Sequence, residues 1–192
     1  KQLDGTQTGK IMLDYYNAMA ATDPANEQFT ALVENAQRVA DEGADKPFLD
    51  AWFSDAKNGY VVGAFGLIFH TSDGGVSWVP QNEKVDNPQG FHLNAISGSG
   101  SDILIVGEQG LILRLDPVSG SFVALESPFA GSYFGILRTN QGTVIYGLRG
   151  KAFKTTDDGN SWRQLEIPLE NSLTAAAVDV DGQMFLFDQA GD

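Results

Sequence analysis

Short apolar runs separated by glycine-containing turns fill the chain from about residue 48 to its end. Runs of this length, bounded by Gly, Asp and Asn, are typical of antiparallel strands joined by tight turns. The first four strands are predicted over Phe48–Ser54, Tyr60–Gly63, Leu67–Thr71 and Ser77–Gln81. The same pattern predicts further sets over residues 91–125 and 133–165, and an incomplete set over residues 173–192.

A Gly-x-x-Gly pair marks the same position in each set of strands. The gapless copies are Gly63-Ala64-Phe65-Gly66, Gly107-Glu108-Gln109-Gly110 and Gly147-Leu148-Arg149-Gly150, and Asp188-Gln189-Ala190-Gly191 keeps the second glycine. The copies lie 44, 40 and 41 residues apart, a period typical of one four-stranded propeller blade. The sequence therefore predicts a β-propeller segment of about three and a half antiparallel blades.

Two blades carry the motif [Ser/Thr]-x-Asp-x-Gly-x-[Ser/Thr]-Trp, an Asp box. Its residues are Thr71, Asp73, Gly75 and Trp78 in the first copy, and Thr155, Asp157, Gly159 and Trp162 in the second. The Asp carboxylate can accept backbone N–H groups of the turn, the Gly supplies positive φ, and the Trp ring packs under the hairpin. A structural role explains all of these residue types together. Metal binding or acid catalysis by the aspartates is the less favoured interpretation.

The middle blade has a degenerate copy of the box. Phe122 stands where the other copies have Trp, while Pro117 and Ser119 replace the Asp and the Gly. The large apolar residue is kept although the carboxylate is lost. This substitution pattern favours a structural role for the box over a catalytic one.

Residues 8–47 follow a helical pattern instead of a strand pattern. Ile11, Tyr15 and Met19 lie on one face of a short helix. Asp23-Pro24 predicts the start of a second helix, and Gly43 predicts its end. We expect a helical hairpin inserted between blades, packed on the propeller or forming a docking surface for a partner. Residues 1–7 resemble the segment after a box tryptophan, which predicts the tail of a preceding blade.

The two kinds of turn lie at opposite ends of an up-and-down blade. The Asp boxes join the third and fourth strands, whereas the Gly-x-x-Gly turns lie at the end that carries the blade-to-blade connectors and the helical hairpin. Loops on a rigid scaffold commonly carry recognition. The candidate binding residues are therefore Phe65, Glu108, Gln109, Arg149 and Gln189.

Composition excludes several kinds of chemistry. The net charge of −13 and the isoelectric point near 4.3 leave little basic surface for nucleic acid. The chain has no cysteine, so disulfides, thiolate metal sites and cysteine nucleophiles are excluded. His70 and His92 are isolated along the sequence and predict no metal site. We expect no cofactor and no catalytic residues.

The run from Tyr60 to Trp78, with its Gly-x-x-Gly pair and Asp box, resembles the BNR or Asp-box repeat proteins. In particular it resembles the photosystem II stability and assembly factor-like group, over about residues 48–192. The resemblance implies a seven-bladed propeller with a periplasmic or otherwise exported location. It also implies a non-catalytic scaffold that binds a protein partner during assembly of a membrane protein complex or a transporter. Photosynthetic members carry an arginine patch, for which Arg114, Arg138 and Arg149 are the candidates.

A sialidase-like glycoside hydrolase is the alternative function, because sialidases also contain Asp boxes. Such an enzyme needs an arginine cluster, a Tyr nucleophile with a Glu partner, and an Asp acid. The chain has five arginines and no Arg-Ile-Pro segment of the sialidase type. Tyr133 and Tyr146 are more simply explained as strand residues. A small carbohydrate ligand remains an alternative to the protein partner.

Overall fold

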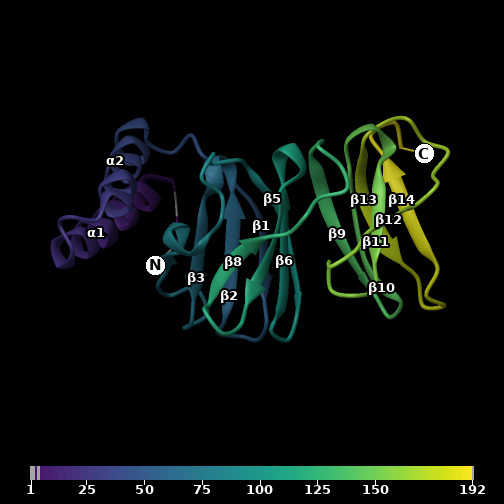
Figure 1. Ribbon diagram of the computed structural model, residues 1–192, viewed down its shortest axis with the longest axis horizontal. Coiled ribbons are helices and arrows are strands. Elements are labelled where there is room, and N and C mark those ends of the chain that lie inside the picture. The colour runs from purple at the N-terminus through teal and green to yellow at the C-terminus, as the bar shows by residue number, and fades with distance from the viewer. Residues whose placement is uncertain (1–2, 4, 192) are drawn as a thin grey trace.

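The computed structural model of the chain describes residue 3 and residues 5–191. Over these residues the chain forms two α-helices, four short 3₁₀ helices, three four-stranded antiparallel sheets and one two-stranded sheet. Figure 1 shows the helices at one end of a row of sheets that follows the chain from β1 to β14. The predicted fold class, a run of propeller blades preceded by a helical hairpin, is confirmed.

Each complete blade is an up-and-down sheet whose strands pair in chain order. The first blade contains β1 (Phe48–Phe53), β2 (Gly59–Gly63), β3 (Ile68–Thr71) and β4 (Val79–Pro80). The second contains β5 (Leu93–Ser99), β6 (Asp102–Gly107), β7 (Ile112–Asp116) and β8 (Ser121–Ala124). The third contains β9 (Tyr133–Thr139), β10 (Gly142–Gly147), β11 (Ala152–Thr155) and β12 (Arg163–Gln164). The half-blade contains β13 (Leu173–Val178) and β14 (Met184–Asp188).

The blades bury alternate residues against their two neighbours. In β6, Ile103 and Ile105 belong to the core shared with the first blade, whereas Leu104 and Val106 belong to the core shared with the third. Successive side chains of a strand point to opposite faces, so a strand covered on both faces is apolar at every position. This explains why the central strands of the repeat are continuous apolar runs.

The helical hairpin covers the face of the first blade that points away from the second. Helix α1 (Gly5–Thr22) and helix α2 (Glu27–Glu42) bury Met12, Tyr16, Ala36 and Val39 in a core shared with Leu67 and Phe69 of the first blade. Gly9 permits close packing of the helices, because a Cβ at this position would lie 2.5 Å from Ala40 Cα. The hairpin thus forms the outer wall of the first blade.

The helix ends differ in part from the sequence expectation. The N-cap of α2 is Asn26 rather than Asp23, and its side chain accepts a hydrogen bond from the Gln28 backbone at 3.1 Å. Gly43 ends the helix with φ 78°, as predicted. Neither described helix combines the length and the apolar character needed to span a membrane.

The start of α1 also departs from the expected domain boundary. Residues 5–7, expected in the tail of a preceding blade, are helical. Thr8 is buried and Gly9 packs closely against α2. This packing stabilises the first turn of α1, so the helix begins before the boundary expected at residue 8. The rest of the expected tail includes residues 1, 2 and 4, which lie outside the described residues.

Candidate functional site

The Asp boxes form the same hydrogen-bonded turn in the first and third blades. Asp73 accepts hydrogen bonds from the Thr71 hydroxyl at 2.9 Å, the Ser77 backbone at 2.9 Å and the Ser77 hydroxyl at 2.6 Å. Asp157 accepts the corresponding bonds from Thr155 and Ser161 at 2.7, 2.9 and 2.6 Å. Hydrogen bonds from the serine lower the pKa of each carboxyl to about 2. Both oxygens of each carboxylate are therefore engaged in closing the turn.

Glycine and tryptophan complete each box. Gly75 and Gly159 both have φ 87°, a left-handed conformation that disfavours other residues. A Cβ on either glycine would lie 3.4 Å from the indole ring of Trp78 or Trp162. Both tryptophans are half-buried rather than fully enclosed. The rings therefore pack against the turn itself as well as against the blade.

The second blade closes its turn with a carboxylate that the motif alignment misses. Asp116 accepts hydrogen bonds from the Val118 backbone at 3.0 Å and the Ser119 hydroxyl at 2.7 Å, and bonding to Ser119 lowers its pKa. This aspartate stands one position before Pro117, which aligns with the box aspartates. Phe122, in the place of the tryptophan, is 2% exposed. The turn is thus closed by equivalent chemistry shifted by one residue.

The Gly-x-x-Gly turns share an unusual backbone conformation at the opposite end of the blades. Phe65, Gln109 and Arg149 occupy equivalent positions and have φ of 55°, 53° and 58°. Non-glycine residues pay a steric penalty in this left-handed region. All three side chains are exposed. Conformational strain at an exposed and repeated position is a recognised sign of a functional site.

The turns are held by the residue that precedes each inner strand. In the second blade, Glu108 N–H donates to the His92 carbonyl at 3.1 Å, and His92 N–H donates to the Glu108 carboxylate at 2.9 Å. Gln189 N–H donates in the same way to the Ser172 carbonyl at 3.0 Å in the half-blade. Hydrogen bonds thus hold the backbone of the turn in place, while the side chains of Gln109, Arg149 and Gln189 extend into solvent.

Phe65 lies in a small cluster that joins the hairpin to the second blade. Its ring packs edge-on against His92, with the ring centroids 4.8 Å apart, and Lys46 Nζ lies 5.4 Å from its centroid. Burial alone would lower the pKa of Lys46, but its bonds to Asp45 and Glu42 outweigh burial and raise it. Phe65 nevertheless remains 55% exposed. Phe65 therefore presents an apolar ring to solvent beside the Lys46 ammonium group, which Glu42 and Asp45 hold in place.

The inner strands add apolar surface near the same end, which the sequence reasoning missed. A one-residue irregularity in the pairing of each inner strand leaves Leu49, Asn94, Phe134 and Thr174 without a cross-strand partner. Leu49 is 45% exposed and Phe134 is 37% exposed. Such irregularities redirect side chains and are common beside functional sites. The available signal was limited to the first and third blades, where an apolar residue, Leu49 or Phe134, stands at this position, whereas Asn94 and Thr174 stand there in the other two.

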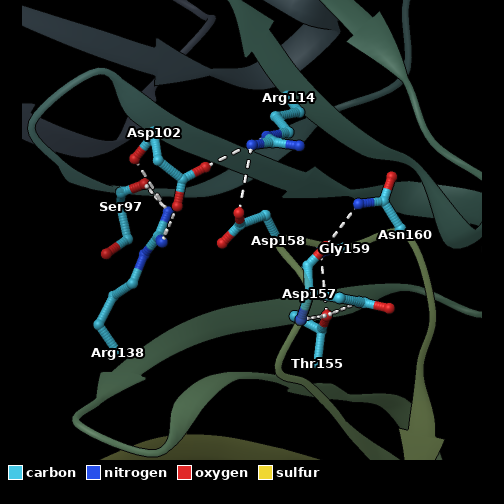
Figure 2. A network of polar contacts seen from close by, with 9 residues as sticks. All are labelled: Ser97, Asp102, Arg114, Arg138, Thr155, Asp157, Asp158, Gly159 and Asn160. Carbon is cyan, nitrogen blue, oxygen red and sulfur yellow. Dashed lines mark hydrogen bonds and ion pairs between the residues drawn. The ribbon is translucent and has the colours of Figure 1, made fainter.

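The three candidate arginines do not form one patch. Arg138 in β9 pairs with Asp102 of the second blade and donates to the carbonyls of Ser97 and Asp102 at 3.1 Å. Arg114 in β7 lies 3.3 Å from Asp102 and 3.7 Å from Asp158 (Figure 2). Both belong to the end that carries the Asp boxes, whereas Arg149 lies in a Gly-x-x-Gly turn. The pairing with acids makes Arg114 and Arg138 a link between two blades.

Two tyrosines considered for a hydrolase are core residues. Tyr133 is 0% exposed and its hydroxyl lies 3.0 Å from the Ser127 hydroxyl. Tyr146 is 7% exposed. Burial raises the pKa of both phenols, which makes them poorer nucleophiles. Among the described residues, no three His, Asp or Glu side chains gather in a way that could hold a metal ion.

A concave surface adjoins the Gly-x-x-Gly turn of the first blade. It is a groove of about 840 Å³ between helix α2, Phe65, the connector of residues 82–90 and the start of β8. The groove is lined by residues of a Gly-x-x-Gly turn, of the helical hairpin and of a blade-to-blade connector. The sequence predicted that these three kinds of segment lie at the same end of the blades. The groove's combination of helix, turn and edge strand was not predictable from the repeat.

Four-stranded blades with Asp boxes at one end and hydrogen-bonded Gly-x-x-Gly turns at the other define an Asp-box β-propeller. The family model described as "Photosynthesis system II assembly factor YCF48" matches residues 29–165. The chain therefore belongs to this family, as the resemblance in the sequence indicated.

Relatives in this family are longer than the chain. The "Photosystem II assembly lipoprotein Ycf48" of Synechococcus sp. (strain CC9902) is 27% identical over 132 residues, which cover 67% of this chain and 38% of the relative. The protein of the same name from Prochlorococcus marinus (strain MIT 9313) is 32% identical over 120 residues, covering 60% of this chain and 35% of the relative. This chain thus spans well under half of each curated relative.

Solved structures show the same fold. The structure described as "YCF48 bound to D1 peptide" matches with a TM-score of 0.63 at 23% identity, covering 75% of this chain and 49% of that one. The structure "YCF48 from Cyanidioschyzon merolae" matches with a TM-score of 0.59 at 20% identity, covering 76% of this chain and 51% of that one. At these identities the likeness concerns the fold of the blades.

Proposed function

We propose that the protein is a non-catalytic propeller scaffold that binds a protein partner through the end carrying the Gly-x-x-Gly turns. The observation that carries the proposal is the repeated left-handed conformation of the exposed residues Phe65, Gln109 and Arg149. At Gln109 and Arg149, whose side chains extend into solvent, no described contact offsets the strain, and glycine would adopt the same conformation without it. A requirement for the side chains themselves explains why three blades retain it.

The family supports an assembly or accessory role toward a membrane protein complex, and a transporter is the other partner that the sequence resemblance implies. Curated relatives are named as assembly lipoproteins of photosystem II, and one solved relative is described as bound to a D1 peptide. The lipoprotein name also supports an exported or periplasmic location for this protein.

Site-specific photo-crosslinking in the native host tests the binding end. The full-length protein would carry p-benzoylphenylalanine at position 109 or 149, with position 57 in the β1–β2 turn as the control at the Asp-box end. We expect adducts with a membrane protein from positions 109 and 149 and not from position 57, detected by gel shift and identified by mass spectrometry. Equal adducts from all three positions would contradict the proposal.

A stability measurement separates loss of binding from loss of folding. The double variant Gln109→Gly/Arg149→Gly removes the left-handed strain, so its free energy of unfolding should rise by about 1 kcal/mol. Its capture of the identified partner should nevertheless fall. Lys151→Gly, at an ordinary φ of −82°, should lower stability slightly and leave capture unchanged. A double variant that is more stable and still binds fully would assign the turns a structural role alone.

A further inference from the structure

The helical hairpin lies where the repeat places a preceding blade. We call the face concerned the leading face, and three repeat positions define it: two before, six after and fifteen after the first glycine of the Gly-x-x-Gly pair. These positions hold Ile105, Leu113 and Phe122 in the second blade, Ile145, Phe153 and Trp162 in the third, and Val61, Phe69 and Trp78 in the first. The second blade packs them on the first blade, and the third blade packs them on the second. The first blade packs them on the hairpin (Figure 1).

The hairpin buries this face as deeply as a blade does. Phe69 is 0% exposed beneath the helices, whereas the equivalent Leu113 and Phe153 are 0% and 4% exposed beneath a blade. Leu67 of the same face is 1% exposed. Protein interiors are close-packed, so one face cannot contact two elements at once. The hairpin and a preceding blade are therefore mutually exclusive occupants of the leading face of the first blade.

The hairpin forms a unit that can leave the face intact. Its two helices pack closely on each other at Gly9, where a Cβ would lie 2.5 Å from Ala40 Cα. The short link of residues 43–47 joins it to β1. Hydrogen bonds to the connector after β4 come from the hydroxyl groups of Tyr15 and Tyr16. The helices thus keep their mutual contact when these bonds and the apolar contacts with the first blade are given up.

A blade that docks on a leading face must present an apolar trailing face, the face that a blade turns toward the following one. Two repeat positions define the trailing face: one before and five after the first glycine of the Gly-x-x-Gly pair. They hold Val62 and Ile68 in the first blade, Val106 and Ile112 in the second, and Tyr146 and Ala152 in the third. Each of these side chains is apolar and at most 7% exposed in a core shared with the following blade. The occupant that fits the leading face of the first blade is therefore a blade of this same repeat.

We propose that a further blade of the same protein docks on the leading face of the first blade, and that the hairpin is a displaceable cap on this face. The equivalent faces of the second and third blades each hold a blade. The same chain is the source of the occupant, because this chain matches 38% of the Synechococcus relative, which leaves length for further blades of about 40 residues each. Docking of that blade moves the hairpin off the first blade.

Photo-crosslinking within the full-length protein identifies the occupant. The photoreactive p-benzoylphenylalanine would replace Phe69, or Phe153 as the matched control at the equivalent position of the third blade. Position 153 should give adducts with the second blade, residues 93–124, whichever element covers the first blade. Position 69 should give adducts with a segment of the same chain outside residues 3–191. Such adducts keep the mass of the monomer, and mass spectrometry of the digested protein locates them.

Methionine oxidation is a second measurement, made on the unmodified full-length protein in case the position 69 variant does not fold. Met12 is 0% exposed while the hairpin is docked, whereas Met19 is half-buried. Displacement of the hairpin should bring the oxidation rate of Met12 in dilute hydrogen peroxide to within about threefold of that of Met19, because the reagent must reach the sulfur. Stronger protection of Met12 would show that the hairpin stays docked and would overturn the inference.

Three crosslinking outcomes would also overturn it. Adducts from position 69 that map to residues 5–42 alone would make the hairpin a permanent cap. Adducts at twice the monomer mass would assign the face to a second copy of the chain. A folded position 69 variant without adducts, beside a control that forms them, would leave the face open to solvent. Crosslinks from positions 109 and 149 to a membrane protein test the binding end separately, so the two proposals fail independently.

Discussion

In each Asp box, both oxygens of the aspartate carboxylate accept hydrogen bonds that close the turn. The two boxes share their donors, and their corresponding hydrogen-bond lengths agree within about 0.2 Å. Asp55 in the β1–β2 turn is held similarly by Asn58 and Lys57, and the pKa of its carboxyl is also lowered to about 2. Short turns at this end of the blades thus depend on ionised carboxylates.

Acid should therefore loosen the Asp-box end. Because the folded pKa of Asp73 and Asp157 lies near 2, below the ordinary value of 3.8, their contribution to stability is present above that ordinary value. It is lost as the pH falls from about 4 to 2. Thermal unfolding followed by circular dichroism should show a lower midpoint over this range. Asp73→Asn should be less stable at pH 7 and lose less on acidification.

Asp14→Asn is the control for this experiment, since Asp14 is exposed on α1 away from the turns. Its unfolding midpoint should follow the parent protein at every pH. A parent protein whose midpoint does not change between pH 5 and pH 2 would contradict the stabilising role of the ionised carboxylates.

The helical hairpin acts as part of the propeller rather than as a free arm. It encloses Leu67 and Phe69, which would otherwise be exposed on the outer face of the first blade. The fully buried Tyr16 donates to Asn82 at 3.2 Å and Glu83 at 3.1 Å and accepts from the Asn82 backbone at 3.1 Å. Burial and Glu83 raise the pKa of this phenol. Deletion of the hairpin would therefore destabilise the blade as well as remove a wall of the groove.

Tyr16→Phe should destabilise the protein by about 1–2 kcal/mol, because it leaves the half-buried polar groups of Asn82 without their partner. Denaturant unfolding measures the change. Tyr15→Phe is the matched control: Tyr15 is half-buried and its hydroxyl makes one bond to Glu83 at 3.2 Å, so the loss should stay below about 1 kcal/mol. Equal effects of the two variants would argue against a special role for the buried hydroxyl.

Polar links between blades hold the row of sheets together alongside the apolar cores. Asp50 of the first blade accepts from the Ile96 backbone of the second at 2.9 Å, and Asn94 of the second donates to the Tyr133 carbonyl of the third at 2.8 Å. Arg138 and Asp102 form a further link near the Asp-box end (Figure 2). The arginines thus stabilise the relative positions of the second and third blades.

Asp102→Ala should weaken the contact between these blades by about 2–3 kcal/mol, because it leaves the half-buried Arg138 without a carboxylate. Hydrogen exchange should show faster exchange at the β5–β6 turn and in β9. Asp158→Asn is the control: its carboxylate is 66% exposed and lies 3.7 Å from Arg114, so its loss should change stability by less than about 0.5 kcal/mol. If Asp102→Ala changed neither the stability nor the hydrogen exchange, the apolar core alone would join the two blades.

The sequence predicted the features that arise from local patterns. The apolar runs and the glycine spacing identified every strand set, and Gly43 marked the end of α2. The prediction failed where competing local signals were close together: Asn26 caps α2 although Asp23-Pro24 fits a helix start, and Asp116 replaces the aligned box aspartate. In both cases a neighbouring polar side chain performs the expected hydrogen bonding from a position a few residues away.

The blade repeat, the Asp boxes and the family could be recognised in the amino-acid order, because each depends on residues within about one blade of each other. The position of the hairpin, the pairing of Arg138 with Asp102 and the groove beside Phe65 became visible only in three dimensions. These features join residues far apart in the chain, such as Tyr16 and Glu83, separated by 67 positions. Periodicity identifies the faces of helices and strands that are buried, whereas packing between distant segments selects their partners.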